Sequence, residues 1–245
     1  MQMAKAIPIS ELPVISRDGP EAGEVSYSAG AILLMDKSAG WSSFDVVKKV
    51  RGMIKVKKIG HAGTLDPAAT GLLMLCTGRA TKSIEQIQEL EKEYVGTVRL
   101  GASTPSYDAE TEIDVEAEWQ HIKREQIESV LRAKFIGLID QTVPPYSAVK
   151  VKGRRLYKSA RKGEEVELKS REVHIREIEI TYINMPDITL KIRCSKGTYI
   201  RSIAHDLGLA LGSRGYLAGL RRTAIGPFSV NEALTVDELQ KKLTA

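Results

Sequence analysis

The chain has 245 residues, and its composition of 42% hydrophobic and 27% charged residues is ordinary for a globular protein that folds in water. The formal net charge of +5 is modest and does not by itself indicate a partner. No apolar run approaches the roughly 20 residues that cross a bilayer, and the N-terminus lacks the apolar core of a signal peptide, so we expect a cytoplasmic protein without a membrane segment.

The first third of the chain predicts two buried strands, each followed by a helix. Residues 1–28 have several prolines and glycines and no hydrophobic period, so we expect a flexible N-terminal extension that is ordered only where something pins it. The aliphatic run at 31–37 predicts a buried strand, and "SSFD" at 42–45 predicts a capping box that starts a helix. A second buried strand is expected at 71–78 and a helix at 80–90.

Strands and helices alternate less regularly in the rest of the chain. Strand-like runs occur at 92–101, 166–168, 173–183, 188–194 and 220–225. Helices are expected at 124–135, at 154–161 within a long surface segment, at 198–211, and after a second capping box at 235–238. This order predicts an α+β fold, with a mixed, largely antiparallel central sheet flanked by helices, in a single catalytic-size domain at 29–245.

The charges are segregated along the chain. Residues 48–58 hold six basic side chains and no acid, residues 150–162 hold seven and no acid, and residues 108–118 are strongly acidic. A single basic run is most often a solvated face, but two such runs with tyrosines near the second favour a nucleic-acid partner. Cys76 and Cys194 lie in apolar segments and the histidines are scattered singly, which predicts buried thiols and no metal.

Asp66 lies in a glycine-rich stretch, "IGHAGTLDPAATGLL", and has two interpretations. As the residue before a proline it suits the N-cap of a short turn, with Pro67 at the first position, so its role could be structural. The same position favours an ionised carboxylate, and Gly60, Gly63 and Gly71 would let a ligand approach the backbone, so Asp66 could also be a nucleophile. Spacing leaves both readings open.

The motifs of common cofactor enzymes are absent from the sequence. No GxGxxG, GxxxxGK[ST] or GxSxG pattern occurs, so nothing in the sequence indicates a nucleotide cofactor, NTP hydrolysis or a serine hydrolase. We therefore expect an activity that needs neither cofactor nor metal.

Several ordered motifs closely resemble the tRNA pseudouridine synthase B (TruB) family. "GHAGTLDPAATGLL" resembles its catalytic motif, and the resemblance extends from about residue 31 to 239. The other motifs, in family order, are "ILLMDKSAGWSSFDVV", "KEYVGTVRLG", "PPYSAVKVKGRRLYKSARKG", "CSKGTYIRSIAHDLG" and "LRRTAIGPF". The chain departs from the family pattern at Ser38, where a proline is usual, and in "STPSYDAET", which lacks a usual glycine.

The resemblance implies a role for each matching residue. Asp66 would be the nucleophile, Tyr94 would stack on the target base, and Arg201 would pair with the Asp66 carboxylate. Leu220 would line the base pocket and His61 would enter the RNA loop. Lys37, Tyr199 and Lys196 would shape the site or contact the backbone, and Lys150, Arg154 and Arg155 would bind RNA within the basic segment at 146–163. Without the resemblance, Arg201 could be a surface cation, Leu220 plain core, and His61 and His205 ordinary turn and surface histidines.

The implied reaction converts the uridine at position 55, in the T-loop of tRNA, to pseudouridine by base flipping, glycosidic cleavage and reattachment through C5. Asp66 could attack C1′, add to C6 or remove the C2′ proton. We expect a monomer whose partner is the T-arm of tRNA, and a segment at 146–163 that becomes ordered when RNA binds. Many relatives continue into an RNA-binding PUA module, so we also expect this catalytic domain to recognise RNA unaided. An RNA chaperone without chemistry and a nucleoside-bond hydrolase remain the alternatives.

Overall fold

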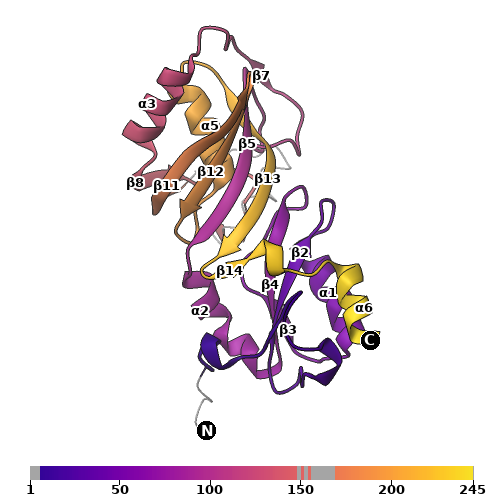
Figure 1. The fold of residues 1–245 in the computed structure, drawn as a ribbon. Coiled ribbons are helices and arrows are strands. Elements are labelled where there is room, and N and C mark those ends of the chain that lie inside the picture. The colour runs from indigo at the N-terminus through magenta and orange to yellow at the C-terminus, as the bar shows by residue number, and fades with distance from the viewer. Residues whose placement is uncertain (1–5, 148–149, 152–153, 156–168, 245) are drawn as a thin grey trace. The chain divides into compact units, whose positions relative to one another are not determined.

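The computed structural model describes residues 6–147, 150–151, 154–155 and 169–244, and the chain forms two compact units (Figure 1). The first unit consists of Met1–Glu93 and Arg221–Ala245, and the second of Tyr94–Leu220. The chain passes between them within strand β5 (Lys92–Leu100) and returns within strand β13 (Gly215–Ile225). The sequence predicts one catalytic domain at 29–245, and the structure divides that range between these two units, the first of which also includes the N-terminal extension.

In the first unit, a sheet carries helices α1 (Ser43–Ile54) and α6 (Val236–Thr244) side by side (Figure 1). The strands are ordered β1 (Val14–Ile15), β2 (Ile32–Lys37), β4 (Thr70–Thr77) and the end of β13, with β3 (Ile59–His61) also paired to β4. Strands β2 and β4 are antiparallel, whereas β13 runs parallel to β4. The remaining elements are η1 (Ile9–Glu11), η2 (Ala22–Glu24), η3 (Gly78–Ser83), α2 (Ile84–Glu89), β14 (Phe228–Ser229) and η4 (Val230–Glu232).

Strands β2 and β4 are buried on both faces. Alternate residues enter two separate hydrophobic clusters, so that Leu34 and Met74 lie in one and Met35 and Leu75 in the other. Since a strand covered on both sides needs apolar residues at every position, both strands read as continuous aliphatic runs in the sequence. The buried strands predicted at 31–37 and 71–78 are confirmed.

The N-terminal extension is pinned within its described part, residues 6–28. Strand β1 pairs in parallel with β2, and Leu12, Ile15 and Ala22 are buried. Arg17 forms an ion pair with Glu238, 3.1 Å apart, and Lys242 donates to the carbonyl oxygens of Arg17 and Gly19. The condition that the sequence sets for an ordered extension, a partner that holds it, is therefore met by β2 and α6.

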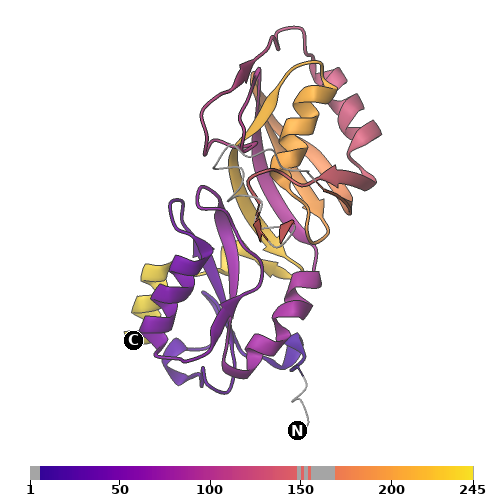
Figure 2. The same ribbon diagram turned by 180° about the vertical axis from the view of Figure 1, so that it is seen from behind.

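The second unit is a largely antiparallel sheet with helices α3 (Arg124–Lys134) and α5 (Ile200–Ala210) on one face (Figure 2). Its strands are ordered β13, β5, β12 (Asp187–Cys194), β11 (Ser170–Asn184) and β8 (Gly137–Thr142). Short strands β6 (Ala102–Ser103) and β7 (Val115–Glu116) form a separate pair. The core joins α3, α5 and the sheet through Ile127, Leu131, Ile203 and Leu207, all of them buried.

The predicted fold class is confirmed: the sheet is mixed, mostly antiparallel and flanked by helices. Several boundaries differ from the prediction, three of them in ways that change the element. The helix expected at 80–90 begins as a 3₁₀ turn, and the last strand begins at Gly215, five residues early. Residues 154–155 form strand β10 (Arg154–Arg155), which pairs with β9 (Lys150–Val151), so no helix begins at 154. The rest of that expected helix, and the strand expected at 166–168, lie outside the described residues.

Cys76 and Cys194 are both buried thiols, as predicted. Across the described ranges, no helix is both long and apolar enough to cross a membrane.

Gly71 joins the two parallel strands β4 and β13 at close range. It has φ +101°, and a Cβ on it would lie 2.2 Å from the Arg222 carbonyl oxygen. Gly71→Ala should therefore lower the free energy of unfolding by more than about 2 kcal/mol. Gly52→Ala is the matched control, because Gly52 lies in α1 with open space around it, and alanine should change stability by no more than about 1 kcal/mol there. Urea denaturation compares the two, and equal stability would contradict this account of Gly71.

Candidate functional site in two parts

Asp66 opens a tight turn between β3 and β4. The Ala69 N–H donates to the Asp66 carbonyl oxygen (3.1 Å), which closes the turn, and the Gly40 N–H donates to the Pro67 carbonyl oxygen (2.9 Å). Proline suits the second position of such a turn because its φ is already set. The predicted short turn is confirmed, but β4 follows directly and no helix begins at Pro67.

Lys37 is a buried cation beside this turn, only 1% exposed. Its Nζ donates to the carbonyl oxygens of Trp41 (2.7 Å), Ser38 (3.0 Å) and Pro67 (3.2 Å). Burial lowers the pKa of Lys37, while the negative charge of Asp66 opposes that change. The same attraction stabilises the ionised carboxylate, so Lys37 both holds the turn and favours the charged form of Asp66.

Arg222 and Ser43 hold the residues that precede Asp66. The buried guanidinium of Arg222 donates to the carbonyl oxygens of Leu72 (2.7 Å), Gly63 (3.1 Å) and Thr64 (3.4 Å). The Ser43 hydroxyl donates to the carbonyl of Leu65 (3.0 Å) and accepts from its N–H (2.9 Å). Side chains from β13 and α1 therefore fix the backbone on the N-terminal side of the carboxylate.

His61 ends strand β3 opposite Leu75 of β4. Burial and the nearby positive charge of Arg222 lower the pKa of His61, so its imidazole is neutral at neutral pH. Its Nδ1 is buried and, within the described part of the chain, has no hydrogen-bond partner. A neutral ring with an unsatisfied nitrogen can interact with a polar group of a ligand.

The glycines of this stretch pack against the protein itself. A Cβ on Gly60 would meet Ile84 at 3.0 Å, and Gly71 lies against the backbone of Arg222. Gly63 has φ +109° and lies near the Arg222 guanidinium. The expectation that Gly71 lets a ligand approach is therefore wrong, because the β13 backbone already fills that space.

In the second unit, Arg201 lies in the first turn of α5 and is 5% exposed, so it is not the surface cation that the sequence allowed. Its guanidinium forms an ion pair with Asp108 (3.4 Å) and donates to the carbonyl oxygens of Ser106 (3.2 Å) and Tyr146 (3.1 Å). Asp108 is itself held, because its Oδ1 accepts from the Ser106 hydroxyl (2.6 Å) and the Glu110 N–H (2.9 Å). A buried guanidinium with several fixed partners has a defined orientation.

Tyr94, Leu220 and the start of α5 come together around Gly96. A Cβ on Gly96 would lie 3.4 Å from Ile200 and 3.5 Å from Leu220. Tyr94 lies two residues before Gly96 on β5, so it shares that face of the sheet. Both Tyr94 and Leu220 are partly buried against the hydrophobic core of this unit. The structure therefore groups an aromatic ring, an aliphatic side chain and the helix turn that carries Arg201.

Tyr199, at the N-cap of α5, is held through its backbone by Gln141. The Tyr199 N–H donates to the Gln141 Oε1 (2.7 Å), and the Gln141 Nε2 donates to the Tyr199 carbonyl (3.0 Å). The guanidinium of Arg171 lies 5.2 Å from the centre of the Tyr199 ring. Lys196 is exposed in the preceding turn.

Lys150, Arg154 and Arg155 belong to the β9–β10 pair, in which Arg155 lies opposite Lys150. The predicted ordering of 146–163 on binding concerns mainly residues outside the described ranges and stays a prediction.

The first unit thus places Lys37 beside Asp66 and His61 near Arg222, and the second brings Tyr94, Arg201, Leu220 and Tyr199 together around the start of α5. The predicted pairing of Asp66 with Arg201 joins residues of different units and stays a prediction.

Sequence reasoning missed four supporting residues: Ser43, Asp108, Gln141 and Arg222. Asp108 offered a weak signal as one acid in an acidic run, and Arg222 as a cation in a late strand. Within the described residues, no group of three acidic, histidine or cysteine side chains could hold a metal ion.

Two family models match the sequence of this chain from residue 51 to residue 245. Residues 51–200 match the TruB family pseudouridylate synthase N-terminal domain, and residues 201–245 match the tRNA pseudouridylate synthase B C-terminal domain. Proteins named tRNA pseudouridine synthase B share 49% identity in Parabacteroides distasonis (88% of this chain, 94% of the relative) and 48% in Flavobacterium johnsoniae (89% and 97%).

Solved structures agree with the fold. A Cbf5-Nop10-Gar1 complex contains a chain with TM-score 0.70 and 27% identity, over 97% of this chain and 60% of that one. An H/ACA RNP bound to a substrate RNA containing 2′-deoxyuridine has TM-score 0.64 and 26% identity, over 86% of this chain and 52% of that one. The fold and motifs define the class of pseudouridylate synthases. Within that class, the chain belongs to the TruB family.

The two hydrogen bonds between the Ser43 hydroxyl and Leu65, which clamp the backbone before Asp66, can be tested by removing one atom. Ser43→Ala leaves the buried N–H and carbonyl of Leu65 without their partner and should lower the free energy of unfolding by about 1–3 kcal/mol. Ser38→Ala, which removes an exposed side chain from the loop that precedes α1, should change it by less than about 0.5 kcal/mol. Chemical denaturation measures both, and an unchanged stability of Ser43→Ala would argue against the clamp.

A second test concerns Asp206, one turn beyond Arg201 on α5. Burial raises the pKa of Asp206 to about 6, above the value of about 4 expected when unfolded. Between these values the unfolded chain releases the proton first, so stability should fall as pH rises from about 4 to about 6. Asp206→Asn should lack this decrease and be more stable than the wild type above pH 6. Melting temperatures at a series of pH values measure it, and parallel profiles would contradict the assignment.

Proposed function

We propose that the protein is a tRNA pseudouridine synthase that isomerises the uridine at position 55, in the T-loop, to pseudouridine. The observation that carries the proposal is the Asp66 turn, in which buried Lys37 and Arg222 hold the backbone on both sides of one carboxylate. The attraction of Lys37 favours the ionised form of this carboxylate, and the held backbone limits where it can move, as a nucleophile requires. Membership of the TruB family and the names of the relatives supply the substrate class.

The proposed roles follow from the surroundings of each residue. Asp66 acts on the nucleoside, either at C1′, at C6 or on the C2′ proton. Arg201 pairs with the Asp66 carboxylate, while Asp108 orients the guanidinium. Tyr94 stacks on the target base and Leu220 forms an apolar wall of its pocket, which suits their partly buried positions on β5 and β13, beside the start of α5. His61, neutral and with an unsatisfied nitrogen, enters the RNA loop.

The reaction must remove uracil from the base stack before its glycosidic bond can be reached. Stacking on an aromatic ring contributes about 1–3 kcal/mol per base, which offsets much of the cost of flipping. The N1–C1′ bond then breaks and a C5–C1′ bond forms, with the C5 proton moving to solvent and N1 gaining one. Substrate and product are isomers, so the proposed chemistry needs no redox cofactor, metal or nucleotide.

We further propose that cations of the second unit hold the RNA backbone. Lys150, Arg154 and Arg155 on the β9–β10 pair, with Lys196 and the backbone-held Tyr199, contact the T-arm, and the enzyme acts as a monomer in the cytoplasm. Recognition by phosphate contacts and folded shape is the usual mode for structured RNA.

Incubation of the purified protein with unmodified tRNA should yield pseudouridine at position 55 alone, mapped by chemical labelling and sequencing. Unchanged RNA would support an RNA chaperone, and an abasic site would support a hydrolase.

Asp66→Asn separates the chemical role from the structural one. Asparagine caps a turn about as well as aspartate but is a far poorer nucleophile. The variant should keep its melting temperature within roughly a few degrees and bind tRNA normally, yet lose turnover. Full turnover would refute the nucleophile, whereas loss of folding would show that Asp66 is a structural residue.

A further inference from the structure

The first unit contains a basic pocket that the proposed chemistry does not use. It has a volume of about 700 Å³ and lies where the end of α1, the start of β3 and η3 meet residues 26–28. Five cations line it: Lys55, Lys57, Lys58, Arg79 and Lys82. The hydroxyl groups of Ser26 and Ser28 line the same pocket.

The charge of this pocket is unbalanced. No acidic residue is among the described residues that line it. Lys55, Lys57, Lys58 and Arg79 are exposed, and within the described ranges none of these four is in an ion pair. Like charges gathered around a concave surface repel one another and concentrate anions. Cations with hydroxyl donors are the groups that bind phosphate oxygens.

Backbone geometry gathers these cations. Lys55 ends α1 with φ +51°, a left-handed conformation that is uncommon for a residue with a side chain. The Gly78 N–H donates to the Lys58 carbonyl oxygen (2.9 Å), which brings the segment before β3 against the start of η3. The sharp end of α1 and this backbone hydrogen bond therefore bring together lysines from 55–58 and cations from 79–82.

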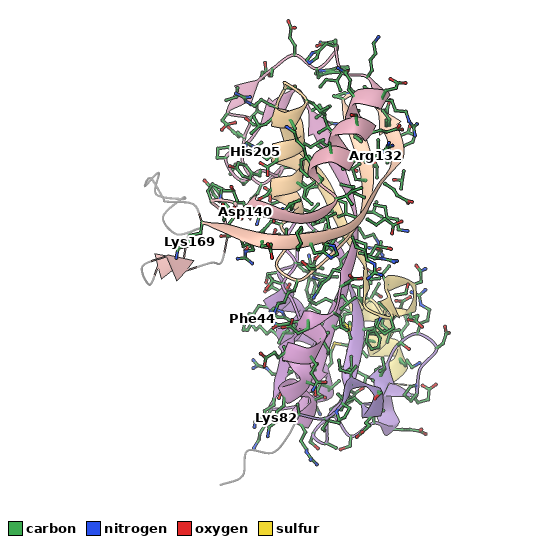
Figure 3. The ribbon with its side chains drawn as sticks, turned by 90° about the vertical axis from the view of Figure 1, so that its left-hand side faces the viewer. Phe44, Lys82, Arg132, Asp140, Lys169 and His205 are labelled. Atoms are coloured by element: carbon green, nitrogen blue, oxygen red, sulfur yellow. The ribbon has the colours of Figure 1, made fainter. Side chains whose placement is uncertain are left out.

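The pocket and the Asp66 turn lie at opposite ends of β4. The turn leads into Thr70, while Gly78 lines the pocket, and the eight intervening steps of strand span about 26 Å. Figure 3 labels one residue near each place. Phe44 follows Ser43, which binds Leu65 beside the Asp66 turn, and Lys82 lines the pocket. The two labelled residues lie far apart in the first unit (Figure 3). A small ligand is too short to reach both places, whereas a folded RNA is long enough to do so.

We propose that this pocket binds backbone phosphates of tRNA that lie outside the T-arm, as a second anchor for the substrate. The inference rests on the proposed function and adds a contact that the T-loop itself does not supply. RNA duplexes are A-form and rise less per base pair than the 3.4 Å of B-DNA, so a hairpin with five base pairs extends its duplex by less than about 17 Å from the loop and falls short of the pocket. Full-length tRNA should therefore use the pocket, and the isolated T-arm should not.

The experiment measures binding of two RNA probes by two variants. Lys57→Gln with Arg79→Gln removes two pocket cations, and Lys134→Gln with Lys241→Gln removes two exposed cations elsewhere. The probes are unmodified full-length tRNA and a T-arm hairpin with five base pairs. Affinity is measured from low to moderate salt, and pseudouridine formation is measured in parallel.

The pocket variant should bind full-length tRNA about three- to tenfold more weakly, with a salt slope smaller by about 2, because two phosphate contacts are lost. Its affinity for the hairpin should match that of the wild type, and the control variant should change by less than twofold on either RNA. Equal affinity of both variants for full-length tRNA would overturn the proposal, and so would an equal loss on the hairpin.

A competition arm distinguishes RNA from a free phosphate ligand. The proposal would be overturned in favour of a small ligand by two results together. Millimolar inorganic phosphate or ATP would bind to the wild type but not to the pocket variant, and the pocket variant would bind tRNA as tightly as the wild type. If the wild type makes no pseudouridine on any RNA, the proposed function fails, while the binding measurements still report on the pocket.

Discussion

Two buried cations, Lys37 and Arg222, hold the backbone that positions Asp66. Each donates to three carbonyl oxygens, and together they bind the chain on both sides of the carboxylate. A buried charge is tolerated only when its hydrogen bonds are satisfied, and a buried carbonyl likewise needs a donor. Because the cations and the turn satisfy one another, neither can move without a loss of stability. Gly63 and Gly71 allow this arrangement because both have a positive φ, and Gly71 leaves room for the backbone of Arg222.

The second unit orients its cation by the same principle. Arg201 is surrounded by Asp108 and two carbonyl oxygens, and Asp108 is fixed in turn by the Ser106 hydroxyl and the Glu110 N–H. Polar groups held in this way lose little freedom when a substrate binds, which is the advantage of a preorganised site. Each unit therefore presents a rigid part of the proposed site: a carboxylate on one, and a guanidinium with an aromatic and an aliphatic side chain on the other.

Cations of this protein perform two distinct tasks that the sequence does not separate. Lys37 is buried and structural, whereas Lys57 and Lys58 are exposed around a pocket without acids. The acidic run at 108–118 is similarly divided, since Asp108 is buried against Arg201 while Glu116 is exposed. Charge counts therefore indicated a polyanion partner, but only burial distinguishes a residue that binds a ligand from one that holds the fold.

The sequence by itself determined the elements whose signal is local. Hydrophobic runs identified β2 and β4, capping boxes identified the starts of α1 and α6, and an unbroken motif around Asp66 identified the family. Only the tertiary structure decided the partners of those residues. Arg222 lies 150 residues or more from the carbonyls it binds, and Ser43 lies 22 residues from Leu65. Hydrogen bonds between such distant segments leave no periodic trace in a single sequence, because they depend on how strands and helices pack rather than on the spacing within one element.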